Sequence, residues 1–237
     1  MTQAAFKKSL SIVLPVYNEQ DNISYVVSRI NKVFSSEVFN FEIIAVDDGS
    51  TDRTPDILKG LQSSKDNFRV ITHQKNKGYG SALLSGFAEA SKEWVFMMDA
   101  DGQFDAVDSF RLFAHAADAD IVCGFRVKRR DSFLRRFLGY LSIFFIRFLF
   151  GISLKDIKCG FKLLRRAALT KMMPVISATT GMINVEIVLL AKKYRLRVKE
   201  AGVSHFPRLH GKQKGVRFFS ILRSSLEVFR LKCKLHT

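Results

Sequence analysis

The stretch Trp94-Val-Phe-Met-Met-Asp99-Ala-Asp101-Gly-Gln103 decides how the rest of the chain is interpreted. Its apolar residues stop at two carboxylates one residue apart, and a run of that length predicts a buried strand. The acids then stand at the carboxyl end of the strand, where open α/β sheets bind ligands. Two close carboxylates repel each other unless a cation lies between them, and oxygen ligands favour Mg²⁺ or Mn²⁺, commonly shared with substrate phosphates. The stretch therefore predicts a metal site for a phosphorylated ligand. A polar loop in which an aspartate caps a helix is the alternative.

The remaining elements alternate along the chain. Short apolar runs predict strands, and apolar residues at helical spacing predict the helices between them. The predicted strands are 10–15, 41–46, 68–72, 94–98, 119–123 and 197–205, and the predicted helices are 21–34, 51–61 and 81–90. Strands that alternate with helices predict an α/β fold with a mostly parallel sheet flanked by helices.

Composition narrows the class of protein. The chain has 237 residues, of which 47% are hydrophobic, so we expect one large domain with a substantial core. It has no uncharged apolar stretch long enough for a simple membrane span, and residues 1–8 lack the order of a signal peptide. The three cysteines, Cys123, Cys159 and Cys233, are far apart and odd in number. They predict neither a zinc cluster nor a disulfide framework, and they favour a reducing, cytosolic compartment.

The net charge of +16 is concentrated in the second half of the chain. Residues 1–125 hold 12 Lys/Arg against 17 Asp/Glu, whereas residues 126–237 hold 26 against 5, a net charge of +21. An excess of this size predicts an anionic partner, which is a phosphorylated substrate, an acidic lipid surface or a nucleic acid.

Two aromatic segments carry much of this charge. Residues 132–150 predict one Phe-rich helix that includes Arg135, Arg136 and Arg147, and residues 217–234 predict a second basic amphipathic helix. This composition is typical of helices that lie in a membrane interface. A buried helix with snorkelling arginines is the alternative for the first segment.

Three further motifs follow predicted strands. Pro15-Val-Tyr17-Asn-Glu19 can line a base or ribose, and Val46-Asp47-Asp48-Gly49-Ser50-Thr51-Asp52 offers carboxylates to a ribose or a base N–H. Arg208-Leu-His-Gly211-Lys-Gln-Lys214 is a glycine-hinged basic loop that can close over a diphosphate. Each motif alone is also explained by helix caps or a solvated charge run, so the weight lies in their ordered set.

With these motifs the chain resembles family 2 glycosyltransferases of the GT-A (Rossmann-like) fold, and within them the dolichyl-phosphate mannose synthase and polyprenyl-phosphate glycosyltransferase branch. Gly124-Phe-Arg126 and residues 156–166 extend the match, which spans about residues 8–215. The resemblance implies a GT-A domain over 1–215, with a nucleotide-sugar and metal half at 1–125 and an acceptor half at 126–215. An amphipathic basic helix at 216–237 would follow it.

The resemblance also implies roles for individual residues. Asp99, Asp101 and Gln103 would be the ligands of Mg²⁺ or Mn²⁺. The catalytic residues would be Asp101, Arg126 and Asp156. Donor and phosphate contacts would come from Pro15, Tyr17, Glu19, Val46, Asp48, Asp99, Ala100, Asp101, Arg126, Arg208 and Lys214. The chain departs from the branch at Gly211-Lys-Gln-Lys214, where serine usually precedes the lysine, and at Cys159-Gly-Phe-Lys162, where Ser-Gly-Phe-Arg is common.

The implied reaction is an inverting, metal-dependent transfer of a sugar from a GDP- or UDP-sugar to a polyprenyl phosphate on the cytoplasmic face of a membrane. A phosphate acceptor is already anionic and needs positioning more than a base. A saccharide or lipid hydroxyl acceptor would need a base, for which Asp156 and Glu186 are candidates. As alternatives to that role, Asp156 would cap a turn and Glu186 would be an acid on a helix surface.

The predicted partners are the nucleotide-sugar, the polyprenyl phosphate and an anionic membrane surface, with the protein peripheral on that membrane. A small membrane-anchoring subunit and a homo-oligomer both stay open. A nucleic-acid-binding module is the hypothesis from another class, and it leaves the acidic motifs unexplained, so we expect no nucleic acid.

Overall fold

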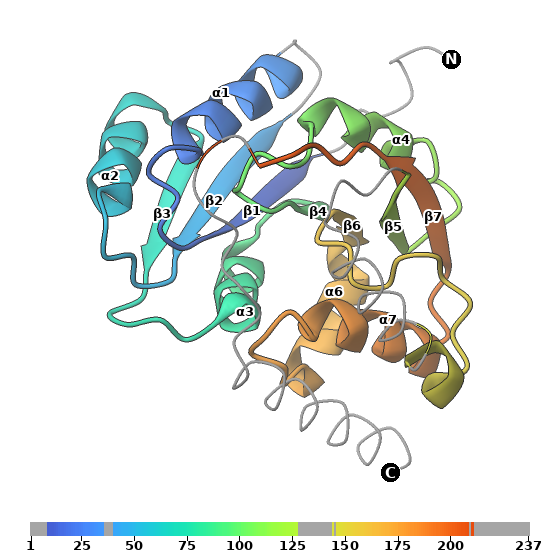
Figure 1. Ribbon diagram of the computed structural model, residues 1–237. Coiled ribbons are helices and arrows are strands. Elements are labelled where there is room, and N and C mark those ends of the chain that lie inside the picture. The colour runs from blue at the N-terminus through green and yellow to red at the C-terminus, as the bar shows by residue number, and fades with distance from the viewer. Residues whose placement is uncertain (1–8, 36–39, 128–143, 145, 209, 211–237) are drawn as a thin grey trace.

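A single mixed sheet organises the computed structural model, which describes residues 9–35, 40–127, 144, 146–208 and 210 (Figure 1). Within these residues seven strands lie in the order β3-β2-β1-β4-β6-β5-β7. Their bounds are β1 Leu10–Val16, β2 Phe41–Asp47, β3 Phe68–Thr72, β4 Trp94–Met97, β5 Ile121–Arg126, β6 Lys162–Arg165 and β7 Val198–Val203. The six predicted strands and the mostly parallel α/β fold are confirmed, and β6 is an additional strand that we did not predict.

The strand pairing is parallel except at β6. β1 pairs in parallel with β2 and β4, β2 with β3, and β5 with β7. β6 runs antiparallel between β4 and β5, with Lys162 opposite Met97. Because β6 runs the other way, it begins at the edge where its neighbours end. The segment before β6 and the segments after β1, β2, β4 and β5 are thus brought to one edge of the sheet.

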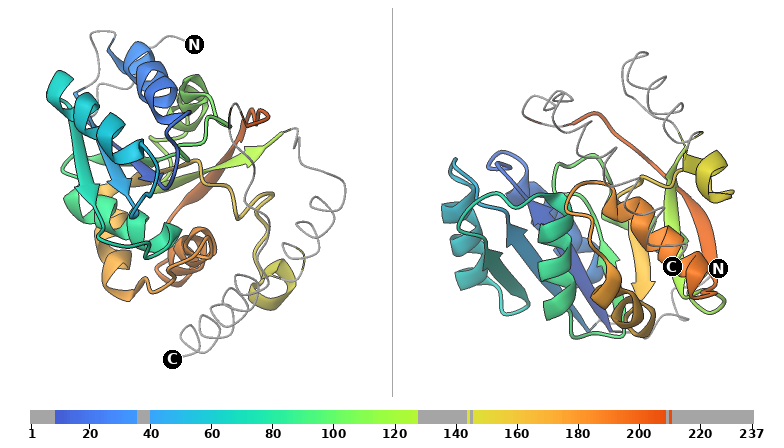
Figure 2. Two further views of the ribbon diagram at one scale, coloured as in Figure 1. Left: turned by 60° about the vertical axis from the view of Figure 1, so that its left-hand side comes forward. Right: turned by 90° about the horizontal axis from the view of Figure 1, so that it is seen from below.

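Helices cover both faces of the sheet (Figure 2). One apolar core lies between the sheet and α1, α2 and α4, and the other lies between the sheet and α3, α6 and α7. The helix bounds are α1 Ile23–Phe34, α2 Thr54–Ser64, α3 Tyr79–Glu89, α4 Ser109–Phe113, α6 Arg166–Met172 and α7 Ile183–Lys193, with 3₁₀ turns η2 Ala106–Asp108 and η3 Met173–Val175. The three predicted helices correspond to α1, α2 and α3.

Alternation along β1 supplies both cores. Leu10, Ile12 and Leu14 pack on the α1 side, whereas Val13 packs on the α3 side, and all four are fully buried. Strands buried on both faces have the continuous apolar sequences that predicted them here.

Most of the two predicted basic helices falls on residues that the structure does not describe. Residues 144 and 146–150 are described, and they are helical. Phe144 and Phe148 on this turn are 68% and 80% exposed. The predicted helix at 216–237 lies outside the described residues. Among the residues that are described, no helix is both long and apolar enough to cross a membrane.

Candidate active site

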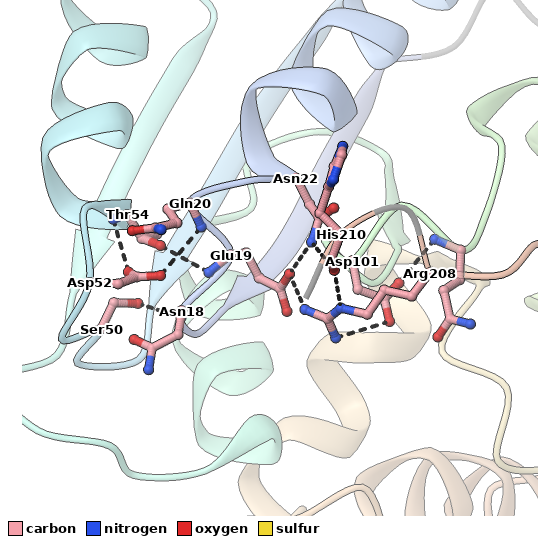
Figure 3. A network of polar contacts seen from close by, with 11 residues as sticks. Asn18, Glu19, Gln20, Asn22, Ser50, Asp52, Thr54, Asp101, Arg208 and His210 are labelled. Atoms are coloured by element: carbon pink, nitrogen blue, oxygen red, sulfur yellow. Dashed lines mark hydrogen bonds and ion pairs between the residues drawn. The ribbon is translucent and has the colours of Figure 1, made fainter. Parts of the chain in front are cut away.

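The loops after β1 and β2 are joined by hydrogen bonds that involve backbone N–H groups. The Asn18 N–H donates to Ser50 Oγ at 2.9 Å (Figure 3), and the Thr51 N–H donates to Asn18 Oδ1 at 2.8 Å. The Glu19 N–H donates to Thr54 Oγ1 at 2.9 Å. Asn18 has φ of +54°, a left-handed conformation that asparagine tolerates better than most residues. The two predicted nucleotide motifs therefore form one surface at the carboxyl edge of the sheet.

The donor-pocket residues of these motifs divide between this edge and the core. Pro15 and Tyr17 are half-buried at and just beyond the end of β1. Val46 is fully buried in the α3-side core, and Ala100 is buried in the α1-side core. The side chains of these last two residues shape the fold beneath the pocket rather than its surface.

The carboxylate of Asp48 is buried and supports the loop after β3. It accepts hydrogen bonds from the Lys77 and Gly78 N–H groups, both at 2.8 Å, and its Oδ1 lies 2.7 Å from His73 Nδ1. His73 Nε2 in turn lies 2.9 Å from Ser85 Oγ on α3. His73 was not among the predicted site residues, because a lone histidine after a strand gives no local indication of the acid that it contacts.

The two acids of the metal motif lie in different environments. Asp99 Oδ1 accepts a hydrogen bond from Tyr79 Oη at 2.7 Å. Burial raises the pKa of Asp99, while Tyr79 and the charges of Arg126 and Lys162 act to lower it. Burial and the nearby charge of Asp99 raise the pKa of Asp101 to about 7. A carboxylate so destabilised is a favourable position for a cation.

Arg208 is the cation that Asp101 meets in this structure. Its guanidinium forms an ion pair with Glu19 and lies 3.9 Å from Asp101 Oδ2 (Figure 3). Asn22 Nδ2 also donates to Glu19, at 2.8 Å. The structure thus brings together the predicted residues of three separate motifs, and it brings them to the end of β4.

Gln103 fixes the segment after β7 beside this cluster. Its backbone N–H donates to Asp101 Oδ1 at 3.1 Å, and its side-chain Nε2 donates to the Phe206 carbonyl at 3.0 Å. The Phe206 N–H returns a bond to the Gln103 carbonyl at 2.8 Å. A metal at this position would have the two carboxylates and the Gln103 amide oxygen, a set that suits a hard cation completed by phosphates. Among the described residues no three His, Cys, Asp or Glu side chains form a metal group by themselves.

Arg126 and Asp156 form a buried ion pair near the end of β5. The Arg126 Nε and Nη2 donate to the two Asp156 oxygens at 2.6 and 3.0 Å, and Asp156 is 6% exposed. The two predicted catalytic residues are therefore in contact. Bonded in this way, Asp156 is a poor base, because the guanidinium stabilises its ionised form.

Glu186 does not lie on a helix surface, contrary to that interpretation of the sequence. It is fully buried on α7 and accepts hydrogen bonds from the Ser177 and Ala178 N–H groups at 2.9 and 2.7 Å. Its carboxylate therefore holds the loop before α7, which explains its burial without a role as a base. The hydrophobic spacing of α7 continues around most of the helix, which is why the sequence did not indicate which face Glu186 occupies.

A cavity of about 440 Å³ lies beside Arg208. It is bounded by Val26 and Arg29 of α1, by Phe104, and by Phe206 and Arg208 after β7. Arg29 is paired there with Asp105 at 2.9 Å. The cavity borders the carboxylate cluster on the α1 side of the sheet.

Residues 11–173 match the sequence pattern of glycosyl transferase family 2. The chain belongs to this family. The match includes β1 to β6, so the family pattern covers the carboxylate motifs and the Arg126–Asp156 pair, while Arg208 follows it.

Curated relatives place the family 2 chain near its polyprenyl-phosphate members, as the sequence predicted. It is 30% identical over 214 residues to a dolichyl-phosphate beta-glucosyltransferase of Dictyostelium discoideum, covering 82% of this chain and 65% of that one. It is 34% identical over 209 residues to an undecaprenyl-phosphate 4-deoxy-4-formamido-L-arabinose transferase of Edwardsiella ictaluri, covering 86% and 62%. The chain thus spans a little less than two thirds of the length of these relatives.

Solved structures confirm the GT-A-like fold of this family 2 chain. A glucosyl-3-phosphoglycerate synthase from Mycobacterium tuberculosis superposes with a TM-score of 0.70 at 20% identity, covering 96% of this chain and 80% of the other. That protein was crystallised with Mn²⁺, uridine diphosphate and glucosyl-3-phosphoglycerate. At this identity the likeness shows the fold alone.

The two departures from the branch pattern have different outcomes. Cys159 and Lys162 are both buried before and at the start of β6, with the lysine Nζ bonded to the Cys159 carbonyl. They are internal, so they do not form a surface for an acceptor. The other departure is the glutamine of Gly211-Lys-Gln-Lys214, and this stretch, including the predicted phosphate contact Lys214, lies outside the described residues.

Proposed function

We propose that the protein is an inverting, metal-dependent glycosyltransferase that moves a sugar from a nucleotide-sugar to a polyprenyl phosphate. The observation that carries the proposal is the cluster of Asp99, Asp101 and Arg208 at the carboxyl edge of the sheet, beside the joined loops after β1 and β2. Membership of family 2 and the relatives named for dolichyl- and undecaprenyl-phosphate support it.

On the donor side, Asp101, Asp99 and Gln103 would hold Mg²⁺ or Mn²⁺. The bound cation would neutralise charge on the departing nucleoside diphosphate. Arg208 would supply a second positive charge, since its guanidinium already lies 3.9 Å from Asp101. Tyr17, Glu19 and the loop supported by Asp48 would form the wall against the nucleoside of a GDP- or UDP-sugar.

On the acceptor side, Arg126 would bind the phosphate of the lipid. Its side chain is 15% exposed, and its guanidinium is held in place by Asp156. A phosphate monoester is ionised near neutral pH, so the acceptor oxygen needs no base and Asp156 acts by orienting Arg126. Attack from the face opposite the diphosphate would invert the anomeric centre.

The membrane location is part of the same proposal. The +21 charge of residues 126–237 and the exposed Phe144 and Phe148 support binding at an anionic membrane surface. We infer that residues 126–215 form the acceptor half and 216–237 an interfacial helix, with the protein peripheral on the cytoplasmic face. A membrane-anchoring subunit or a second copy would add to this attachment.

Asp101→Ala tests the donor site, with Asp66→Ala on the exposed loop before β3 as the matched control. We expect thermal stabilisation by Mn²⁺ with UDP- or GDP-sugars in the parent and the control, and none in Asp101→Ala, since binding to the native state raises the melting temperature. Transfer to a polyprenyl phosphate should be lost with it. Retained metal-dependent transfer in a folded Asp101→Ala protein would refute the metal role.

An acceptor panel tests the second half of the proposal. We expect a phosphate-linked product that mild acid hydrolyses, formed on polyprenyl phosphate and not on the matching polyprenol. Transfer to a saccharide or lipid hydroxyl instead would support the glycosyltransferase activity and contradict the proposed lipid-phosphate acceptor.

A further inference from the structure

A chain of polar side chains runs through the protein interior to Asp99. Lys162, the first residue of β6, is fully buried, and its Nζ donates to Asn184 Oδ1 on α7 at 2.8 Å. The Asn184 side chain adjoins the Tyr79 hydroxyl at the start of α3. Burial and Asp99 raise the pKa of this hydroxyl, and the smaller effect of Asn184 acts to lower it. Tyr79 Oη lies 2.7 Å from Asp99 Oδ1. Three elements from distant parts of the sequence are thus linked to one carboxylate.

The direction of every hydrogen bond in this chain is determined by the lysine. An ammonium group has donors only, so Asn184 must turn its carbonyl oxygen toward Lys162. The NH₂ group of Asn184 is then the part that faces Tyr79. The tyrosine's single proton is given to Asp99, with 2.7 Å between Tyr79 Oη and Asp99 Oδ1. All of the donors therefore point toward the carboxylate.

The backbone on either side of Tyr79 is also held. The Gly78 N–H donates to Asp48 Oδ2 at 2.8 Å, and the Gly80 N–H donates to the Thr179 carbonyl at 2.9 Å. A Cβ on Gly80 would lie 2.2 Å from the Ala178 carbonyl oxygen, so only glycine allows this approach. The position of the tyrosine hydroxyl is consequently fixed by the fold.

Gly160 encloses the Asp99 carboxylate and the Tyr79 hydroxyl from another direction. A Cβ on this glycine would lie 2.6 and 2.7 Å from the two Asp99 oxygens and 2.8 Å from Tyr79 Oη. The loop before β6 therefore packs directly on the hydrogen-bonded pair. Because the Tyr79 hydroxyl is bonded to Oδ1 and Gly160 packs against both oxygens, the Asp99 carboxyl group has little freedom to rotate.

We propose that Tyr79 is a positioning residue for the donor site, which holds the Asp99 carboxyl group in one orientation with Oδ1 occupied and Oδ2 left for the metal-bound donor. The inference rests on the proposed function, and it assigns a role to Tyr79, Asn184 and Lys162, which none of the sequence motifs assigned. Groups that orient a metal-binding carboxylate are typically worth 10- to 100-fold in metal affinity.

Tyr79→Phe removes the hydroxyl and keeps the ring, with Tyr194→Phe on the exposed end of α7 as the control. The measurement is the affinity for Mn²⁺ by calorimetry at saturating UDP or GDP, whichever raises the parent's melting temperature. We expect about tenfold weaker Mn²⁺ binding in Tyr79→Phe and no change in the control. The affinity for the nucleotide in EDTA should stay unchanged, which a general loosening of the site would not allow.

Asn184→Asp tests the direction of the bonds at constant size. An aspartate still accepts from Lys162 but has no proton to give Tyr79, so the tyrosine would turn its own proton away from Asp99. We expect the same weakening of Mn²⁺ binding as in Tyr79→Phe, and no further loss in the double variant. Additive losses would mean that the two residues act separately and would overturn the proposed chain.

The outcomes separate this inference from the function on which it rests. If the parent binds Mn²⁺ with nucleotide, Asp101→Ala does not, and Tyr79→Phe equals the parent, then the positioning role is wrong and the donor site stands. If the parent binds no Mn²⁺ with either nucleotide, the proposed function fails and the inference fails with it.

Discussion

At the scale of single residues, the site concentrates negative charge that the fold itself does not neutralise. Burial and the charge of Asp99 raise the pKa of Asp101, and Arg208 lies 3.9 Å from Asp101 while it is paired with Glu19. Such an arrangement costs stability in the absence of a ligand and gains from a bound cation. This cost in the free energy of unfolding should change with pH, because it depends on the ionisation of Asp101.

Asp101→Asn should stabilise the metal-free protein at pH 8 more than at pH 5. The pKa of Asp101 is raised to about 7 in the folded state, so the native protein holds this proton more tightly than the unfolded chain. The stabilisation from the protonated acid is complete below the ordinary pKa of 3.8 and is lost as the pH rises through 7. Removing the acid should therefore gain about 1–2 kcal/mol at pH 8 by urea unfolding in EDTA. An equal effect at both pH values would contradict this origin.

Asp156→Asn should destabilise the protein strongly, because it leaves Arg126 without its bidentate partner. Loss of one member of a buried ion pair typically costs about 3 kcal/mol in the free energy of unfolding. The matched control is Asp120→Asn, whose partner Arg197 is exposed, and which should change the unfolding free energy far less. If the two variants unfold at the same denaturant concentration, the Arg126–Asp156 pair is not a structural contact of consequence.

At the scale of elements, helix α3 packs closely against strand β1 at a glycine. Gly86 of α3 faces Val13 of β1, and a Cβ there would lie 2.4 Å from Val13 Cγ1. On α2, Gly60 is exposed with nothing within 4 Å of the same position. The two glycines lie in helices of equal length and differ in what a methyl group would meet.

Gly86→Ala should therefore destabilise the protein by about 1–3 kcal/mol, because overpacking outweighs the better helix propensity of alanine. Gly60→Ala should stabilise it by up to about 1 kcal/mol from propensity alone. Thermal unfolding of the two variants measures this difference in sign. Stabilisation by both changes would mean that β1 and α3 separate at little cost.

The sequence predicted the elements whose apolar pattern is regular, and it missed the short helices α4 and α6 and the elements whose pattern is broken by a buried charge. β1 to β4 are short, mainly apolar runs and were predicted to within a few residues. β6 is only Lys162–Arg165, with a basic residue at each end, and nothing local indicates that Lys162 is fully buried. α7 was missed as well, although its acid Glu186 was noticed.

The candidate site was also predicted only in part. The grouping of Asp99, Asp101 and Arg208 followed from the ends of strands and from the family resemblance. The contacts that hold Asp99 and Asp48 were not predicted, because Tyr79 and His73 reach these acids across the fold rather than along the chain. Pairings between residues 20 or more positions apart depend on strand order, and the insertion of β6 was not predictable from a four-residue run.

At the scale of the whole molecule, charge and exposed aromatic residues predict adsorption to acidic membranes. The chain should sediment with vesicles of phosphatidylglycerol and phosphatidylcholine and release as salt increases, since the attraction is screened within about 10 Å at 0.1 M salt. Phe148→Glu should weaken this binding severalfold, because it places a charge where an 80% exposed ring would enter the interface.

The control for that experiment is Val107→Glu, at an exposed position of η2 beside the α1-side core, across the sheet from the core that contains Ile146. It should bind vesicles like the parent. Salt-independent binding, or equal weakening by both changes, would contradict an electrostatic surface centred on the turn with Phe144 and Phe148.

The antiparallel strand β6 has a consequence for how the chain is made. Until β6 is available, β4 has β1 on one side and a bare row of peptide groups on the other, and all four of its side chains are apolar. Lys162 follows Met97 by about 65 residues, so a ribosome working at about 5–20 residues per second leaves that edge open for roughly 3–13 s. In that interval the nascent chain presents an apolar strand with an open edge, just before the Asp99-Ala-Asp101 motif, as a site for aggregation or for a chaperone.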